Sequence, residues 1–129
     1  MPGRAITIAA TSALVSLAGF VAAAEKPGIN RAEINRGWLT LRTMDCARCH
    51  GRDYEGWTAP SLIASVRDST RERFDRYVLD GDIGRGMPGY RTQPAVTANL
   101  DAIYAYLRAR AQGDVGPGKP DDSPQHPVK

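Results

Sequence analysis

The sequence predicts a small all-α protein of about three to four helices. Apolar residues recur at helical spacing in separate segments, most clearly in the last of them, at Leu100, Ile103, Tyr104 and Leu107. The only two cysteines lie together in Cys46-Ala47-Arg48-Cys49-His50, and no strand-rich run flanks them. No internal repeat, phosphate-binding glycine loop, paired carboxylates or nucleophile-base arrangement is present, so we assign no catalytic residue.

Residues 1–24 are predicted to be a signal peptide. Between Arg4 and Glu25 there is no charged residue, and the Ala-rich stretch closes with Ala22-Ala23-Ala24, a small-x-small cleavage site. We expect cleavage after Ala24 and export to the periplasm, which leaves no integral membrane segment in the mature chain. The alternative is an uncleaved anchor, because the uncharged stretch is barely long enough to span a bilayer.

The first helix is predicted over about residues 31–45. Asn30 followed by Glu33 resembles a capping box, and Ile34, Trp38 and Leu41 then recur at helical spacing. Gly37 lies on the same side and costs helix stability, which indicates a close crossing with another helix.

The remaining elements follow from turn and cap residues. We expect a loop over 51–67, a helix over 70–79 capped by Asp68 or Ser69, and a final helix from about residue 97 that ends before Gly113. The domain therefore spans 25–113. Residues 114–129 are rich in Pro, Gly and Asp, and we expect a polar tail that is disordered or extended on the surface.

Cys46-Ala47-Arg48-Cys49-His50 is the attachment signature of a c-type haem. Each thiol adds across one haem vinyl group, and the His50 imidazole then becomes the proximal iron ligand. A structural disulfide remains possible in principle. A thioredoxin-like pair calls for a βαβ pattern, which is absent here. A zinc site needs further ligands, and the other histidine, His126, lies in the polar tail.

Met87 is the predicted second axial ligand. It lies in Gly84-Arg85-Gly86-Met87-Pro88-Gly89-Tyr90, where the glycines allow close approach to a macrocycle and Pro88 restricts Met87 to an extended conformation. The alternative is a core-packing role, the commonest for a lone methionine. Met44 fits that role, because it lies too near Cys46 to reach the far face of the haem.

In their order these motifs resemble a class I cytochrome c. The resemblance rests on the Cys-x-x-Cys-His motif, Ala59-Pro60-Ser61-Leu62, Leu79-Asp80-Gly81, Gly86-Met87-Pro88 and Ala105-Tyr106-Leu107. It covers nearly the whole mature chain and implies a class I cytochrome c fold whose first and last helices cross near Gly37 and Tyr106. It also implies that the Pro60 carbonyl accepts a hydrogen bond from the proximal histidine, which fixes the imidazole orientation.

An iron bound by both His50 and Met87 has no vacant position, so we expect a one-electron carrier and no enzyme. Two alternatives are a haem c subunit docked to a membrane complex and a haem enzyme or sensor whose methionine is displaceable. We expect a monomer. The formal charge of the whole sequence is +3; removal of Arg4 with the signal peptide and addition of two haem propionates bring it close to zero. The sequence has no run of basic residues, so we expect no nucleic-acid partner.

The segment Tyr106–Ala111, followed by Gly113–Gly118, is similar to the tail of small periplasmic cytochromes that serve quinoprotein alcohol dehydrogenases. This resemblance implies an alcohol dehydrogenase dependent on pyrroloquinoline quinone (PQQ) as the electron donor. A terminal oxidase or another cytochrome is the implied acceptor.

Four further residues are candidates for the haem environment. Trp57 and Tyr54 carry polar tips suited to a propionate, and Arg52 and Arg91 offer charge-assisted hydrogen bonds there. The alternative is that the arginines are solvated and Trp57 covers the haem edge.

We further expect Arg48, Arg85 and Arg91 to form a positively charged rim around the haem edge. Such a rim would steer an acidic partner protein toward the haem. The alternative is an ordinary mixed-sign surface, because Asp45, Asp53, Glu55 and Asp82 are close in sequence.

Overall fold

The computed structural model describes residues 30–120 together with Met1 and Gly3. The predicted cleavage site and the tail beyond Pro120 lie outside the described residues. The helices are α1 (Arg31–Thr43), α2 (Ala47–His50), α3 (Leu62–Asp68), α4 (Arg71–Asp80), the 3-10 helix η1 (Ile83–Arg85), α5 (Pro94–Thr97) and α6 (Leu100–Gln112). The described part of the chain holds no β-strand, and an isolated bridge joins Asp82 to Met87. The predicted all-α class is confirmed.

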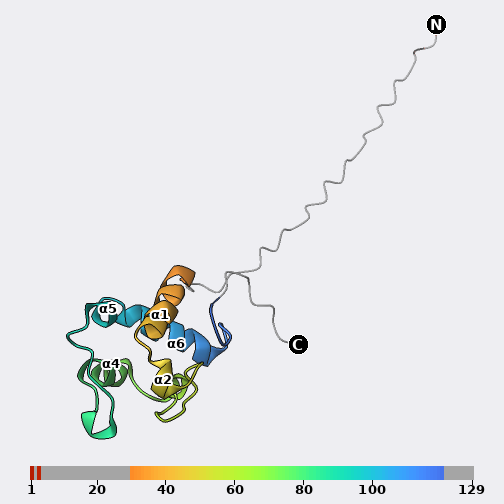
Figure 1. Ribbon diagram of the computed structural model, residues 1–129. Helices are drawn as coiled ribbons and strands as arrows, with labels where there is room; N and C mark the ends of the chain where they lie inside the picture. The colour runs from red at the N-terminus through yellow and green to blue at the C-terminus, as the bar shows by residue number, and fades with distance from the viewer. Residues whose placement is uncertain (2, 4–29, 121–129) are drawn as a thin grey trace.

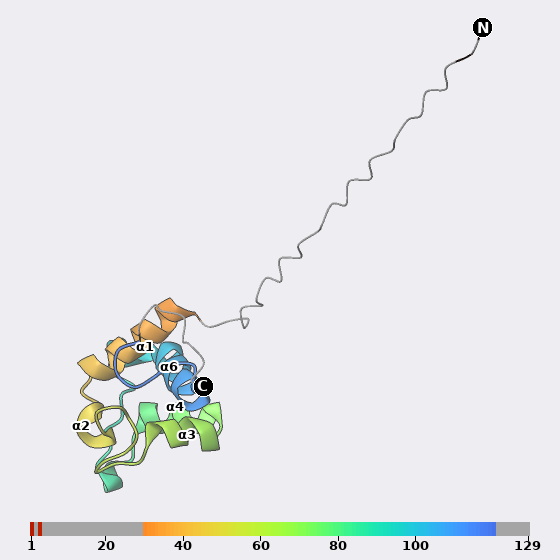
Figure 2. The ribbon, with the colours of Figure 1, turned by 90° about the vertical axis from the view of Figure 1, so that its right-hand side faces the viewer.

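The longest helices, α1 and α6, pack across one another at the centre of the molecule (Figures 1 and 2). At the crossing, a Cβ added to Gly37 would collide with the carbonyl oxygen of Ala102 and lie 2.9 Å from the backbone nitrogen of Ile103. The close crossing predicted from Gly37 is therefore confirmed. Its contact on α6 is Ala102 and Ile103, about one turn before Tyr106.

Both ends of α1 are fixed by local hydrogen bonds. The Asn30 side chain accepts a bond from the Glu33 backbone N–H at 3.1 Å, as the capping pattern predicted. At the other end Asp45 has φ +54°, and the N–H groups of Asp45 and Cys46 donate to the carbonyls of Arg42 and Leu41. This pair of bonds is a Schellman motif, which ends α1 at Thr43, two residues before the predicted boundary.

The predicted loop over 51–67 is wrong from Leu62 onward, where α3 begins. The Ser61 side chain caps this helix by accepting from the Ala64 N–H at 3.1 Å, and α3 buries Leu62 and Val66. Helix α4 is capped by Thr70, one or two residues after the predicted caps.

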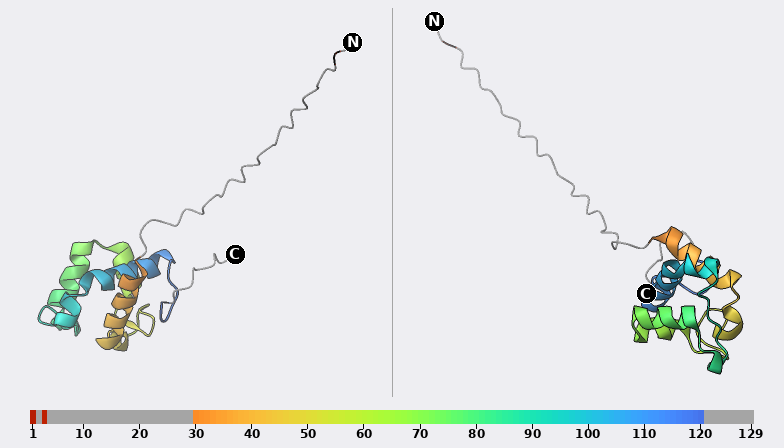
Figure 3. Two further views of the ribbon diagram at one scale, coloured as in Figure 1. Left: turned by 90° about the horizontal axis from the view of Figure 1, so that it is seen from above. Right: turned by 90° about the vertical axis from the view of Figure 1, so that its left-hand side faces the viewer.

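The predicted tail from Asp114 also differs from the structure, because residues 114–120 pack back onto the domain (Figure 3). Val115 is only 5 % exposed. The backbone N–H of Gly118 donates to the Asp53 carboxylate at 3.0 Å, which joins this segment to the loop after α2. The Tyr106 hydroxyl also donates to the Gly118 carbonyl at 3.5 Å, and Pro120 is buried like Val115. Two buried residues and these hydrogen bonds thus hold a segment whose composition is otherwise that of a tail.

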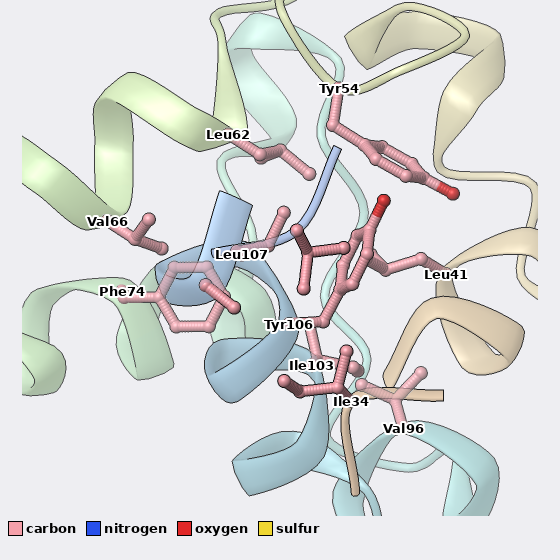
Figure 4. Close-up of a cluster of buried hydrophobic side chains, with 12 residues drawn as sticks. Ile34, Leu41, Tyr54, Leu62, Val66, Phe74, Val96, Ile103, Tyr106 and Leu107 are labelled. Carbon is pink, nitrogen blue, oxygen red and sulfur yellow. The ribbon is translucent and has the colours of Figure 1, made fainter. Parts of the chain in front are cut away.

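The hydrophobic core lies between α1, α6 and the loop and helix that follow α2 (Figure 4). Tyr106 and Leu107 are fully buried, and α3 adds Val66 from the side. None of the described helices is both long enough and apolar enough to cross a membrane.

We predict that Gly37→Ala destabilises the protein by about 2 kcal/mol or more, because the new methyl group must displace the backbone of α6. Alanine is the better helix former, so a loss of stability can come only from the crossing. Gly84→Ala is the control, since its Cβ would meet nothing closer than 3.7 Å. Denaturant unfolding of the haem-loaded variants measures both, and a Gly37→Ala protein as stable as wild type would contradict the prediction.

Candidate haem site

The two cysteines are presented by α2, a single helical turn. The N–H groups of Cys49 and His50 both donate to the carbonyl of Cys46, at 3.3 and 3.0 Å. Both thiols are free, with Cys46 partly buried and Cys49 exposed, so the disulfide alternative is not what the structure shows. Burial raises the pKa of the Cys46 thiol to about 11.

The His50 ring is held by the next loop. Its Nδ1 lies 2.7 Å from the carbonyl oxygen of Pro60, the contact that the resemblance implied. A carbonyl only accepts hydrogen bonds, so Nδ1 carries the proton and Nε2 of the neutral imidazole keeps its lone pair. Nε2 is therefore the nitrogen available to a metal.

The loop between α2 and α3 is folded tightly against the cysteine motif. Gly56 N–H donates to the His50 carbonyl at 2.8 Å, and Ala59 N–H donates to the Cys49 carbonyl at 2.9 Å. Gly51 has φ +88°, and a Cβ on it would lie 2.9 Å from the Gly56 carbonyl oxygen. These contacts bring Pro60 back to His50.

The loop that carries Met87 is closed at its base. Asp82 and Met87 exchange two backbone hydrogen bonds, at 2.9 and 3.0 Å. Beside this bridge the backbones around Gly81 and Gly89 are in close contact. A Cβ on Gly81 would lie 2.6 Å from the Met87 carbonyl oxygen, and a Cβ on Gly89 would lie 2.7 Å from the Asp80 carbonyl oxygen. These two glycines allow the chain to double back beside Asp80 after Met87. Met87 is therefore held on a short turn closed by hydrogen bonds, and it is partly buried.

Among the residues predicted to surround the haem, Tyr54 is buried. It is 1 % exposed, has φ +66° and meets the Tyr106 ring edge-on, with centroids 6.0 Å apart (Figure 4). Its hydroxyl makes no hydrogen bond of normal geometry among the described residues, although the Arg42 guanidinium is near enough to act against the rise of the Tyr54 pKa. Burial, reinforced by the neighbouring Tyr106, raises the pKa of Tyr54 to about 12.

The other three predicted haem-environment residues, Arg52, Trp57 and Arg91, are exposed. Arg91 is paired with Asp80, with its Nε 2.9 Å from the carboxylate. Arg52 is exposed, and Trp57 is 80 % exposed.

The structure does not show the expected positively charged rim, because each of the three arginines forms an ion pair with an aspartate. Arg48 pairs with Asp45 at 3.0 Å, Arg85 pairs with Asp82 at 3.6 Å, and Arg91 pairs with Asp80. The mixed-sign alternative describes this surface.

Sequence reasoning missed Arg110, whose side chain is only 5 % exposed. Its guanidinium donates to the Asp53 carbonyl at 3.1 Å, to the Tyr106 hydroxyl at 3.3 Å and to the Glu55 carboxylate at 3.4 Å. Arg110 therefore joins α6 to the loop that follows the haem motif. The available signal was its position four residues after Tyr106, on the buried face of α6.

The donor groups fit a c-type haem. Two free thiols on one helical turn, an imidazole with an available Nε2 and a thioether on a rigid loop are the groups such a haem binds. A zinc site is not supported, because the described residues include no group of three or more His, Cys, Asp or Glu placed to hold a metal ion.

Comparison with known proteins agrees with this donor set. The family model described as "Cytochrome C oxidase, cbb3-type, subunit III" matches residues 32–107. Cytochrome c-555 of Methylococcus capsulatus is 32 % identical over 112 residues, which are 84 % of this chain and 89 % of the relative. Cytochrome c-553I of Paracoccus denitrificans is 37 % identical over 85 residues, 60 % of this chain but only 38 % of the relative.

A solved structure shares the fold. The c-type cytochrome XoxG from Methylobacterium extorquens AM1 matches with a TM-score of 0.63 at 30 % identity, over 72 % of this chain and 61 % of XoxG. This chain therefore spans less than two thirds of both XoxG and cytochrome c-553I. With the haem motif, the helical fold and these relatives together, the chain belongs to the cytochrome c family as a class I c-type cytochrome, an electron carrier with covalently bound haem c.

Proposed function

We propose that the protein is a periplasmic one-electron carrier whose iron is bound by Nε2 of His50 and the thioether of Met87. The observation that carries the proposal is the 2.7 Å contact between His50 Nδ1 and the Pro60 carbonyl, because it selects the tautomer that can bind iron. When bound, haem c supplies the exchange of a single electron between its ferric and ferrous states.

The chain's own residues hold the group and tune it. Cys46 and Cys49 tether it, and the Schellman turn after α1 fixes the position of Cys46. The closed base of the 81–89 loop holds the Met87 thioether, and a methionine ligand raises the reduction potential. Two protein ligands leave no position for a substrate, which supports electron transfer in place of catalysis.

Pro60 and Tyr54 are the residues we place beside the haem. The Tyr54 hydroxyl is buried and makes no hydrogen bond of normal geometry among the described residues, and buried phenols normally make one. Arg91 is paired with Asp80 and keeps further N–H donors for a propionate, so it stays a candidate for the haem environment. Arg52 and Trp57 are exposed and stay candidates for hydrogen bonds to a propionate.

We further propose a PQQ-dependent alcohol dehydrogenase as the electron donor and a terminal oxidase or another cytochrome as the acceptor. The support is the similarity of residues 106–118 to the tail of cytochromes that serve such enzymes, and the signal-like segment before Glu25 supports the periplasm. The test is to mix the oxidised protein with a purified dehydrogenase of this class and its alcohol. Reduction within the enzyme's turnover time supports the assignment, and failure to reduce the haem removes it.

The matching family model favours a second candidate, a haem c subunit docked to a membrane complex. Purification from membranes distinguishes the two. A stable complex with an oxidase would support this candidate, and a free monomer would support the mobile carrier.

Met87→Ala is predicted to abolish the sulfur-to-iron charge-transfer band of the oxidised protein and to lower its reduction potential, because the thioether ligand is lost. Met44→Leu is the control, since Met44 packs against the core and a leucine preserves that packing. Absorption spectroscopy and redox titration measure both properties. A band that persists in Met87→Ala would remove Met87 from the iron.

The raised pKa of Tyr54 predicts a loss of stability in alkali. A tyrosine in the unfolded chain ionises near pH 10, whereas Tyr54 in the folded protein keeps its proton to about pH 12. The contribution of Tyr54 to the free energy of unfolding is therefore complete below pH 10 and is lost as the pH rises to 12. The loss between these pH values should be smaller in Tyr54→Phe, by on the order of 2 kcal/mol. Denaturant unfolding at a series of pH values measures it. Tyr77→Phe, at a partly exposed tyrosine of α4, should follow wild type.

A further inference from the structure

Helix α4 and the loop that carries Met87 form one unit. The N–H groups of Tyr90 and Arg91 both donate at 3.0 Å to carbonyls in the last turn of α4, so the loop returns to the helix that it leaves. Between these points the loop is closed by the backbone bridge from Asp82 to Met87. A displacement of α4 would therefore carry the Met87 thioether with it.

Helix α4 has little backbone contact with the centre of the domain. Helices α1 and α3 approach the backbone of α6 at many positions, whereas α4 approaches it at few. Figures 1 and 2 both place α4 below α6 and the η1 turn lower still. Within the protein itself, side-chain contacts therefore have to fix α4 relative to α6.

The side-chain contacts between these two helices converge on Tyr104 of α6. The buried Phe74 ring meets the Tyr104 ring with centroids 5.3 Å apart. The Arg71 guanidinium lies 4.6 Å from the centroid of the same ring and also donates to the carboxylate of Asp101, one turn earlier on α6. Arg71 thus joins α4 to α6 by a cation–π contact and an ion pair, which we call the Arg71 link.

The Arg71 guanidinium is oriented by its own helix. Its Nε donates to the Asp75 carboxylate at 2.7 Å, while a second nitrogen reaches Asp101. The Arg71 side chain is 32 % exposed in this arrangement, against 80 % for Arg48 in its ion pair. Water and salt screen a partly buried pair less than an exposed one, so the Arg71 link can hold two helices together.

We propose that Arg71 is a positioning residue for the sixth ligand of the iron, because its link to Tyr104 and Asp101 holds α4 and the Met87 loop in place. The inference rests on the proposed function, in which the Met87 thioether binds the iron. When the link opens, α4 is free to move away from α6, and the iron–sulfur bond breaks with its electron pair left on sulfur. The frequency of this opening limits how fast an outside ligand reaches the iron.

The test compares Arg71→Leu with Arg73→Leu, a matched control on the same helix. The Arg73 guanidinium lies 5.6 Å from the ring centroid of Tyr77, also on α4, so its loss leaves the link to α6 intact. At saturating carbon monoxide, the rate at which the reduced protein binds it measures loss of the thioether. This rate should rise about tenfold in Arg71→Leu and stay within about twofold of wild type in Arg73→Leu. Equal rates in the two variants would overturn the proposal.

A general loss of stability has its own control in Arg108→Leu. The Arg108 guanidinium donates to the Val66 carbonyl at 3.1 Å and so joins α6 to α3 instead of α4. If Arg108→Leu accelerates carbon monoxide binding as much as Arg71→Leu does, Arg71 acts only through overall stability and the proposal fails. Arg71→Lys keeps a cation opposite Asp101 and should return the rate to within about threefold of wild type.

Asp101→Asn opens the same link from α6. The Asp101 side chain is 82 % exposed, so this variant should fold even if Arg71→Leu does not. It should accelerate carbon monoxide binding about threefold in the wild-type background and less in the Arg71→Leu background, because the two residues share one contact. No acceleration in the wild-type background would count against the link.

Amide hydrogen exchange separates this proposal from the assignment of Met87. If the oxidised wild type lacks the sulfur-to-iron charge-transfer band, that assignment is wrong, and the exchange rates alone decide whether Arg71 positions the loop. The amides of Tyr90 and Arg91 should exchange about tenfold faster in Arg71→Leu than in Arg73→Leu, while those of α1 stay within about twofold. Equal exchange at Tyr90 and Arg91 in the two variants overturns the proposal.

Discussion

The position of the haem motif depends on the contact between two helix backbones at Gly37. The absence of a side chain there lets α1 lie directly against Ala102 and Ile103 of α6. This crossing sets the direction in which α1 ends, and the Schellman turn at Asp45 then delivers Cys46 to the haem side of the core. A methyl group at the crossing would separate the helices and displace the attachment motif with them.

A second constraint acts from the other side of the motif. Arg110 is nearly buried and bonds to the Asp53 carbonyl and the Tyr106 hydroxyl, while the Asp53 carboxylate accepts from Gly118. The Arg110 guanidinium thus connects α6 to the loop after α2, and Asp53 of that loop connects it to the segment after α6. Removal of a buried charge's partners is costly, so this arrangement fixes the loop that returns Pro60 to His50. The tight loop and the tight crossing together determine where the imidazole points.

The features that the sequence predicted well are those encoded by local chemistry. The Asn30 cap and the spacing of Cys46, Cys49 and His50 follow from residue types whose role does not depend on distant neighbours. Gly37 indicated a close approach because a glycine inside a helix costs stability, although the sequence did not identify Ala102 and Ile103 as its contacts. The Pro60 contact came from a family resemblance, and the structure reproduces it.

The features that were missed depend on tertiary packing. Helix α3 is only seven residues long and presents a short apolar pattern that a loop could equally carry. Val115 is a single apolar residue in a polar segment, and its burial becomes visible only once α6 and the 53–55 loop are placed. The expected arginine rim failed for the same reason, because the geometry of each turn decides whether an aspartate three residues away reaches its arginine.

The central claim is that two protein ligands close the iron to exogenous molecules and so restrict this cytochrome to electron transfer. Exposure of the reduced wild-type protein to carbon monoxide at neutral pH tests it most directly. The account predicts an unchanged absorption spectrum over the seconds after mixing, because carbon monoxide must first displace the Met87 thioether. Rapid formation of a carbon monoxide complex would contradict it and would show an open iron suited to an enzyme or a gas sensor.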